Sequence, residues 1–216
     1  MALRVPLFRF RRVPLRAQTS QLLSTIYETS TLPPAYDLEH NLSPADLDAL
    51  AKIRRRRRLH RSALFRMLEP RIDAALDGFV WRLDAPDPSA EATNTAANTA
   101  TNTVAWPLRA VAWNVERGKR FAPLIGLLTE HELLRDADLL LLTEVDIGMG
   151  RSGNLHVPFE LAQRLGMRCV FANSHLVLSP GDSAERDHGQ PNTRALHGCA
   201  LLTKLPVRRF CAVTLP

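Results

Sequence analysis

Two predicted strands run into polar side chains that could bind a metal ion. The first, LRAVAW, is followed by Asn114, and the second, DLLLLT, is followed by Glu144. If these strands are neighbours, an amide and a carboxylate meet at one edge of a sheet. Proteins hold Mg2+ with such oxygen ligands, and the ion neutralises phosphoryl oxygens and helps to activate water. Taken singly, a carboxylate there is more often a helix cap or a surface charge, and an asparagine a turn residue.

A glycine-rich loop follows Glu144 directly. In the segment DIGMGRSGN, Asp146 comes first, Arg151 stands among the glycines, and Asn154 comes last. An arginine in such a loop can contact a phosphate oxygen. The alternative is that the glycines only permit a tight turn and that Arg151 pairs with Asp146.

The elements that must position these residues follow an α/β pattern from residue 107 onward. The alternation of apolar residues and the turn signals predict helices over 118–134 and 156–165, the second ending at Gly166. Strands are predicted over 108–113, 138–143, 168–172, 176–178, 199–203 and 209–214.

Three motifs in this order resemble the endonuclease/exonuclease/phosphatase superfamily, the deoxyribonuclease-like hydrolases. Trp113-Asn114, Thr143-Glu144 and the stretch GCALLTKLP over 198–206 are similar to the family's W-N, Q-E and G-N-A-I-L-S-R-x-P segments. The stretch DIGMGRSGN also resembles a D-x-G-M-x-R-S-G-N loop of a bacterial branch. The resemblance covers residues 107–216 and implies an α/β fold of the α+β sandwich type, with four layers.

The resemblance also implies a role for each candidate site residue. The catalytic residues would be Asn114, which orients the metal-bound phosphate or supports the ligand shell, and Glu144, which binds Mg2+ or Mn2+. The substrate site would be lined by Asp146, Arg151, Asn154 and His197. The implied activity is metal-dependent hydrolysis of a phosphoester, with a nucleic acid or a phospholipid headgroup among the substrates that the family uses.

Two departures from the family pattern limit this prediction. Cys199 stands where the family usually has asparagine. The sequence stops at Pro216, before the family's catalytic histidine, its G-D-x-N segment and its final S-D-H. We therefore expect an incomplete fold whose apolar sheet face lacks its partner. The chain alone is predicted to be inactive as a phosphodiesterase and to need a complementing C-terminal half.

The N-terminal part carries the basic character of the chain. Residues 1–82 contain 15 Lys and Arg and 8 Asp and Glu, which gives this part a net charge of +7. The whole chain has a net charge of +6. We predict a mainly helical extension over 1–82, with one helix or two across 44–78, and a flexible linker or surface insertion over 83–106, where Ala, Thr and Asn dominate. The run Arg54–Arg58 is a solvated helix segment or, alternatively, a surface that binds nucleic acid or an anionic membrane without catalysis.

Composition bears on the compartment as well. No apolar run approaches the ~18 residues that a membrane span needs. The three cysteines form no CxxC pair and are predicted to be buried and unpaired, which favours a cytoplasmic protein. The first 27 residues, with five arginines and no acid, are similar to an organelle presequence, or form a basic arm. A third hypothesis for the whole chain is a degenerate remnant without a selected function.

Overall fold

The computed structural model describes residues 6–7, 26–38, 40–84, 107–179, 181 and 190–211. These residues form a mixed α/β fold, in agreement with the predicted class. Most of the arginine-rich N-terminal segment and of the predicted linker over 83–106 lies outside the described residues.

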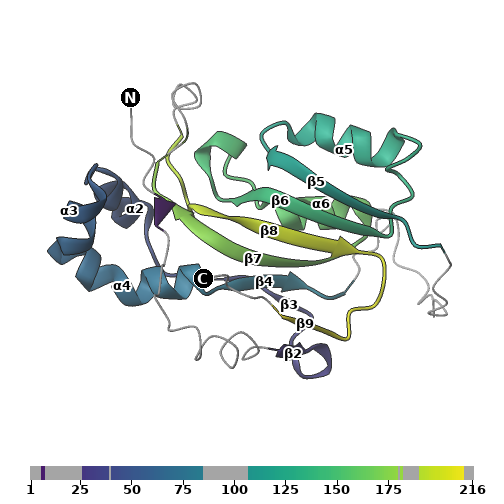
Figure 1. The fold of residues 1–216 in the computed structure, drawn as a ribbon, viewed down its shortest axis with the longest axis horizontal. Coiled ribbons are helices and arrows are strands. Elements are labelled where there is room, and N and C mark those ends of the chain that lie inside the picture. Colours follow the sequence, from purple (N-terminus) through teal and green to yellow (C-terminus); the bar gives the residue numbers. More distant parts are fainter. Residues whose placement is uncertain are drawn as a thin grey trace, which may run out of the picture.

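A seven-stranded mixed sheet forms the centre of the fold (Figure 1). The strands lie in the order β3 (Ala35–Tyr36), β4 (Phe79–Arg82), β7 (Arg168–Val177), β8 (Leu196–Thr203), β6 (Leu139–Ile147) and β5 (Ala110–Arg117), and β1 (Pro6–Leu7) also pairs with β7. β5 and β6 are parallel, whereas the other pairs are antiparallel. A separate two-stranded sheet joins β2 (Ile26–Glu28) to β9 (Arg209–Cys211).

Five α-helices accompany the sheets in the described part of the chain. They are α2 (Pro44–Ala51), α3 (Arg56–Arg61), α4 (Ala63–Leu76), α5 (Phe121–Glu130) and α6 (Val157–Leu165), with short 3-10 turns η1 (Thr29–Thr31) and η2 (Gly150–Ser152). The predicted Ser43 cap of α2 is confirmed as a capping box with Asp46, and Gly166 ends α6 in the left-handed region, with φ 62°.

The one or two helices predicted over 44–78 are in fact three helices. Arg55 is extended, and the chain is extended again at Ser62, whose hydroxyl accepts the amide of Phe65 and caps α4. Since a serine side chain satisfies an amide that the helix itself leaves unpaired, it favours a fresh helix start at this point. The arginine run therefore begins in a loop and ends in α3.

Several strands are longer than predicted, and one predicted pair merges. β5 reaches Arg117 and β6 reaches Ile147, so that Asn114 and Glu144 lie within strands rather than after them. The strands predicted over 168–172 and 176–178 are one strand, β7, because its register shifts between Asn173 and His175 and absorbs Ser174. A bulge of this kind interrupts the alternation on which the prediction depended.

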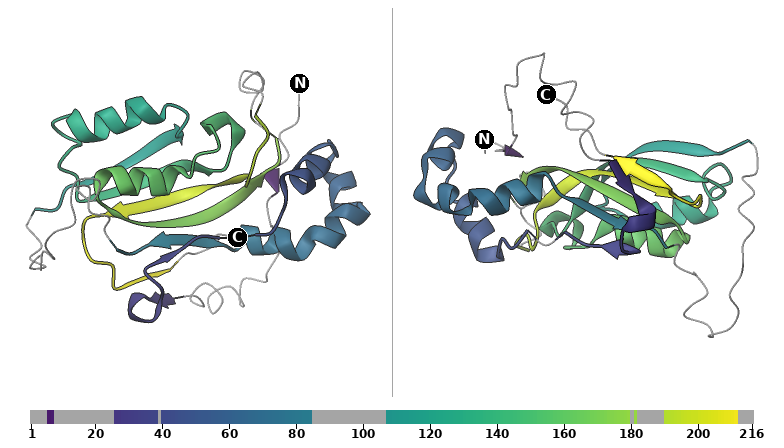
Figure 2. Two further views of the ribbon diagram at one scale, coloured as in Figure 1. Left: turned by 180° about the vertical axis from the view of Figure 1, so that it is seen from behind. Right: turned by 90° about the horizontal axis from the view of Figure 1, so that it is seen from below.

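Different elements pack on the two faces of the sheet. Seen from behind, α6 lies over one face (Figure 2), and it packs against β6, β7 and β8. The buried residues of that face include Leu140, Leu142, Phe171 and Leu202. On the other face the two-stranded sheet covers one end, where Tyr27 stacks on Phe210 and contacts Phe79 and Trp81.

Further along this second face, apolar side chains are exposed. Leu141 of β6 pairs with Leu201 of β8, and the two are 42% and 36% exposed. Because adjacent residues of a strand point to opposite faces, this pair lies opposite the buried leucines that α6 covers. Part of this face is therefore apolar and accessible, and the expectation that it lacks a partner sheet stays a prediction.

The N-terminal residues belong to the central sheet. β4 pairs with β7 along its whole length, and α4 contacts β7 through the side that carries the buried Leu68, Ile72 and Ala75. Predicted as part of a helical extension, residues 79–82 instead form a strand that lies four places from β5 in the sheet. A strand of four residues has too little alternation to be recognised in the sequence.

Of the three cysteines, only Cys169 is buried, whereas Cys199 and Cys211 are exposed, so the predicted burial is wrong for two of them. All three are free thiols. Burial raises the pKa of the Cys169 thiol above its ordinary value. None of the described helices is both long enough and apolar enough to cross a bilayer.

A polar contact ties the N-terminal segment to the rest of the fold. Asp37 accepts hydrogen bonds from His156 and from Arg194, which also donates to the carbonyl of Leu38. Burial would raise the pKa of the Asp37 carboxyl, but the hydrogen bonds and charges of His156 and Arg194 lower it to about 2. The folded state therefore favours the ionised carboxylate.

We predict that Asp37→Asn lowers the free energy of unfolding at pH 7 by about 1 kcal/mol, a modest loss because solvent screens a half-exposed carboxylate. The stabilisation by the ionised Asp37 carboxylate should be complete above pH ~4, the pKa of this group in the unfolded chain. It should disappear as the pH falls through about 2, the pKa in the folded state. Urea denaturation at pH 7 and pH 2 measures both values. Asp48→Asn, in an exposed pair with Lys52, is the control and should change stability little. A loss that persists undiminished at pH 2 would contradict this account.

Candidate functional site

Asn114 and Glu144 lie on adjacent parallel strands. Asn114 is in register with Thr143, one residue before Glu144. β6 shifts register between Leu142 and Val145, so that Thr143 and Glu144 face a single residue of β8. At this bulge Glu144 has φ 53°, an uncommon value for a residue other than glycine. Asn114 and Glu144 are thus neighbours across β5 and β6, as the sequence predicted, although both lie inside their strands and Glu144 lies in a bulge.

The Glu144 carboxylate is partly exposed and lies beside a cation. Its Oε2 is 3.8 Å from Nε of Arg117, whose side chain is 13% exposed while that of Glu144 is 42% exposed. Arg117 itself lies in a turn of three consecutive left-handed residues, Glu116, Arg117 and Gly118. Such strain persists only where the surroundings enforce it, and here the Asn114 side chain accepts the Glu116 amide at 2.9 Å.

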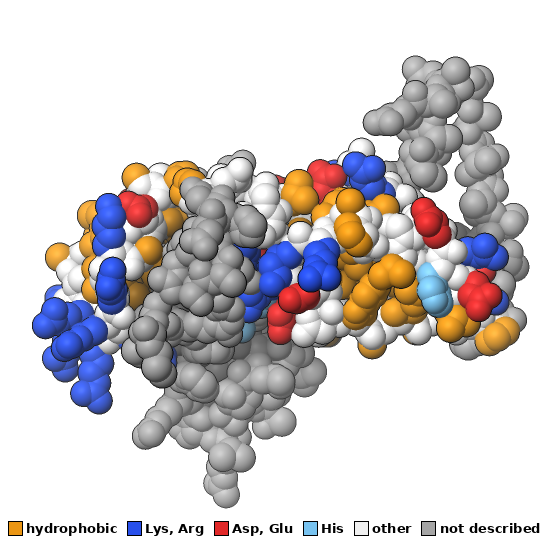
Figure 3. All heavy atoms as spheres, turned by 90° about the horizontal axis from the view of Figure 1, so that it is seen from above, with side chains coloured by type: hydrophobic (Ala, Val, Ile, Leu, Met, Phe, Trp, Pro, Cys, Tyr) orange, Lys and Arg blue, Asp and Glu red, His pale blue; other side chains and the backbone are white. Residues whose placement is uncertain are grey.

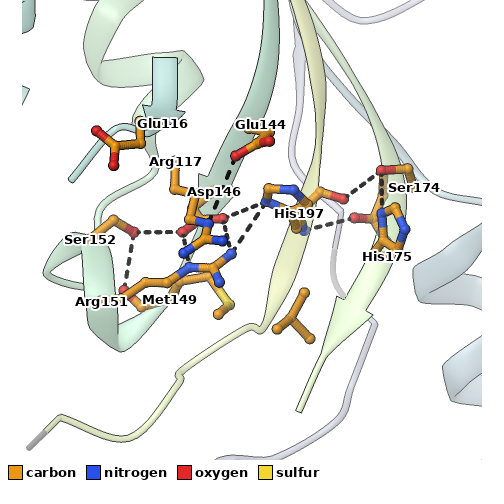
Figure 4. Close-up of polar contacts among 12 residues, drawn as sticks. Glu116, Arg117, Glu144, Asp146, Met149, Arg151, Ser152, Ser174, His175 and His197 are labelled. Atoms are coloured by element: carbon orange, nitrogen blue, oxygen red, sulfur yellow. Dashed lines mark hydrogen bonds and ion pairs between the residues drawn. The ribbon is translucent and has the colours of Figure 1, made fainter. Parts of the chain in front are cut away.

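A fully buried carboxylate lies two residues further along β6. Asp146 receives two hydrogen bonds from Arg151, from Nε at 2.8 Å and from Nη2 at 2.9 Å. Its Oδ1 is 2.7 Å from Nδ1 of His197, and its Oδ2 is 3.3 Å from the hydroxyl of Ser152 (Figure 4). Since an unpaired buried charge is costly, these contacts are what make the burial of Asp146 tolerable.

His197 is itself fixed by β7. Its backbone amide donates to the side chain of Asn173 at 3.1 Å, and its carbonyl accepts from Ser174 at 2.9 Å. Its ring lies across from that of His175, at 5.7 Å between centroids. The polar network therefore extends from η2 across β6 and β8 to β7.

The glycine loop after β6 packs against a second loop, at residues 190–195. The carbonyl of Gly148 accepts the amides of three consecutive residues, 193 to 195. At Gly150 a Cβ would lie 2.0 Å from the carbonyl oxygen of Gln190, so only glycine fits without a backbone shift. Close packing between two loops is therefore what requires glycine at this position.

Asn154 fastens the same two loops together. Its amide nitrogen donates to the carbonyl of Pro191 at 3.1 Å, and its oxygen accepts from the backbone and hydroxyl of Thr193 at 3.1 and 3.2 Å. Both ends of the side chain are therefore engaged within the protein. The substrate contact predicted for Asn154 stays a prediction, and the geometry gives this residue a loop-fastening role.

The structure groups the other predicted residues into two sets. Asp146, Arg151 and His197 form one network, which matches the alternative that Arg151 pairs with Asp146. Asn114 and Glu144 form the second set, on the adjacent strands β5 and β6. With 6% of its side chain exposed, Arg151 is held by Asp146 rather than directed toward solvent. The phosphate contact predicted for Arg151 would need this pair to open.

Sequence reasoning missed three residues that shape the site. Arg117 pairs with Glu144, Ser152 contacts Asp146, and Asn173 holds the backbone of His197. Arg117 could have been identified from the sequence, because it follows the W-N motif within three residues and precedes a glycine. Ser152 and Asn173 had none, since their partners are set by tertiary packing.

Of these residues, Glu144 could serve as a ligand for a hard cation that keeps most of its water. The Glu144 carboxylate is accessible, but the oxygen of Asn114 already accepts the Glu116 amide. Within the described residues there is no group of three or more His, Cys, Asp or Glu side chains placed to hold a metal. Oxygen ligands from one or two side chains together with water are typical of Mg2+ sites.

The chain was compared with protein-family models, curated proteins and solved structures, and none of them matches it.

We predict that Asp146→Asn lowers the free energy of unfolding by about 3 kcal/mol, because the buried Arg151 guanidinium would lose its counter-charge. Adding Arg151→Gln should cost less than the sum of the single changes, since both remove the same pair. Guanidinium denaturation of the four proteins measures this coupling. The control, Asp136→Asn in an exposed pair with Arg109, should cost under ~0.5 kcal/mol. Equal losses for Asp146→Asn and the control would refute the buried-pair account.

Proposed function

We propose that the chain carries part of the active site of a metal-dependent phosphoester hydrolase, as its resemblance to the endonuclease/exonuclease/phosphatase superfamily implies. The observation that supports this proposal is the placement of Asn114 and Glu144 side by side on the adjacent strands β5 and β6. Glu144 is accessible there and is held in an uncommon backbone conformation. The Glu144 carboxylate is the ligand that the proposed reaction would use, with Asn114 beside it.

In this proposal each residue has a separate task. Glu144 holds Mg2+ or Mn2+, and the ion would neutralise phosphoryl oxygens and help to activate water. Asn114 keeps the turn after it in shape by accepting the Glu116 amide, and thereby positions Arg117 beside Glu144. The buried Asp146 and Arg151 hold the loop that borders the site.

The proposed substrate is a phosphoester, either in a nucleic acid or in a phospholipid headgroup. Arg117 is a suitable residue to contact it, because a guanidinium binds phosphate oxygens and this one already lies beside the proposed metal ligand. We expect weak metal binding by the chain alone, since it offers few ligands, and no robust turnover without a complementing half. The cytoplasmic location inferred from the cysteines stays a prediction.

The test separates metal binding from turnover. Addition of Mg2+ to the wild-type chain should shift the backbone amide NMR signals around residue 144, and Glu144→Gln should weaken this binding at least about tenfold, because a neutral amide is a poorer ligand for a hard cation. Glu132→Gln, an exposed carboxylate in another turn, is the matched control. Hydrolysis of a chromogenic phosphodiester is measured in the same samples.

One outcome would count against the proposal, and a second would count against the expectation of an inactive chain. If Glu144→Gln binds Mg2+ as well as the wild-type chain, Glu144 is not the ligand. If the wild-type chain turns over the diester robustly and Glu144→Gln abolishes it, the hydrolase assignment stands but the expectation of an inactive chain is wrong.

A second candidate function is a non-catalytic nucleic-acid-binding module. All five residues of the run Arg54–Arg58 are exposed, and Lys and Arg side chains gather at the end of the molecule that carries α3 (Figure 3). A surface of this kind binds phosphates without regard to sequence. The exposed run supports the alternative that was open from the sequence, and it is also consistent with a solvated helix.

We predict that duplex DNA binding, if it uses this run, weakens linearly with the logarithm of salt concentration. Each phosphate contact contributes ~0.9 to that slope, so replacing Arg54, Arg55, Arg57 and Arg58 by Gln should lower it by up to about 4. Fluorescence anisotropy at several salt concentrations measures the slope. Glu144→Gln serves as the control and should leave it unchanged. A slope that the four arginine substitutions do not alter would exclude the binding surface.

A further inference from the structure

We propose that His40 is an acid-sensitive latch, in which proton uptake by the ring releases the turn at residues 40–42 from the loop at residues 190–195. The latch joins two segments that are 154 residues apart in the chain. His40 is 5% exposed, and its Nε2 lies 2.8 Å from the carbonyl oxygen of Arg194. On the other side of the ring, Nδ1 accepts the backbone amide of Leu42 at 3.1 Å.

Both partners of the ring are backbone groups, and together they determine where its proton lies. The Leu42 amide can only donate, so Nδ1 must carry a lone pair. The Arg194 carbonyl can only accept, so Nε2 must carry the proton. Since neither backbone group can exchange its role, this geometry fits only the neutral ring in one tautomer.

Protonation of Nδ1 would place two donors opposite each other. The new N–H of the His40 ring would point at the Leu42 amide, and the hydrogen bond between them would become a repulsion. Leu42 is 4% exposed, so its amide would then lack a partner inside the protein. Because an unpaired buried amide is costly, the charged ring favours an opened turn in which water reaches both groups.

The turn that the ring closes has an uncommon backbone conformation. Asn41 has φ 55°, in the left-handed region that residues other than glycine rarely adopt. The carbonyl of Asn41 accepts a hydrogen bond from Arg71 of α4 at 3.2 Å, and Ser43, directly after the turn, caps α2. The bond from the Leu42 amide to the His40 ring closes the turn from within, so its loss removes a contact that keeps the turn in this conformation.

The surroundings of the ring favour its neutral form. Burial, the largest influence, lowers the pKa of His40 below its ordinary value of 6.5. The hydrogen bond to the Arg194 carbonyl raises this pKa, the Arg194 charge lowers it, and the Asp37 charge raises it, without reversing the effect of burial. Asp37 is already paired with His156 and Arg194, and Arg71 is a further cation beside the turn.

The latch should therefore open as the solution becomes acidic. The opened turn binds a proton more tightly than the closed turn, so the closed turn has its full stability above pH 6.5 and loses stability as the pH falls below this value. Uptake of one proton changes the opening equilibrium about tenfold for each pH unit, until the pKa of the closed turn is reached.

Opening would reach the loop that packs against the glycine loop. Arg194 belongs to the three consecutive residues whose amides donate to the Gly148 carbonyl, and its side chain also binds Asp37 and the Leu38 carbonyl. Acid would thus remove one of the contacts between the N-terminal segment and the loop at residues 190–195. No metal takes part, so the hydrolase proposal stands or fails independently of the latch.

Amide hydrogen exchange of the full chain, followed by NMR at pH 7 and pH 5, tests the proposal. The protection of the Leu42 amide, corrected for the intrinsic exchange rate at each pH, should be at least about tenfold lower at pH 5 than at pH 7. The Met167 amide, bonded to the Ala162 carbonyl at the end of α6, is the internal reference. Its protection should change by less than about twofold.

His40→Asn separates the latch from other titrations. The oxygen of the asparagine side chain can accept the Leu42 amide in place of Nδ1, and this side chain takes up no proton in the pH range used. The protection of the Leu42 amide in this variant should therefore stay within about twofold between pH 7 and pH 5. His156→Asn, the matched control, replaces the histidine that binds Asp37 and should keep the loss seen in the wild-type chain.

Four results would overturn the proposal. Two come from the wild-type chain and do not depend on the folding of a variant: equal Leu42 protection at pH 7 and pH 5, or ring 15N signals at pH 7 that place the His40 proton on Nδ1. The other two come from the variants: an acid-induced loss in His40→Asn as large as in the wild-type chain, or no such loss in His156→Asn.

Discussion

The burial of the Asp146 carboxylate is the constraint on which the site depends. A charge without access to water is tolerated only where it is paired and hydrogen-bonded. Asp146 is 0% exposed, and it meets this requirement through Arg151, His197 and Ser152. These partners come from η2 and β8, so the position of one side chain on β6 determines both the path of the following loop and the orientation of a histidine.

The glycine loop is a consequence of this constraint. To bring Arg151 back onto Asp146, the chain must turn sharply after β6, and it does so against residues 190–195. Gly150 permits close contact with the Gln190 carbonyl, and Asn154 fastens the two loops. The loop is consequently held by contacts from within the protein.

The sheet itself shows how a short segment distant in the sequence completes a fold. β4 joins β7 and presents Phe79 and Trp81 to the face where the two-stranded sheet packs through Tyr27. Asp37, through His156 and Arg194, adds a polar connection between the same N-terminal region and the loops near the site. The basic N-terminal part thus contributes structure to the sheet in addition to charge.

The sequence by itself determined the local elements and the polar residues at their ends. Apolar spacing located β5, β6 and α6, and local signals such as Ser43 and Gly166 marked where helices begin and end, because these features depend on neighbours within one or two turns.

Only the tertiary structure decided what those polar residues contact. That Arg151 binds Asp146 was one of two alternatives in the sequence, and that His197 completes the pair depends on the register of β8 against β6. The role of Asn154 and the addition of β4 to the sheet likewise depend on partners 37 to 93 residues away in the chain. No local pattern specifies such contacts, because the free energy that selects them comes from burial and pairing across the assembled sheet.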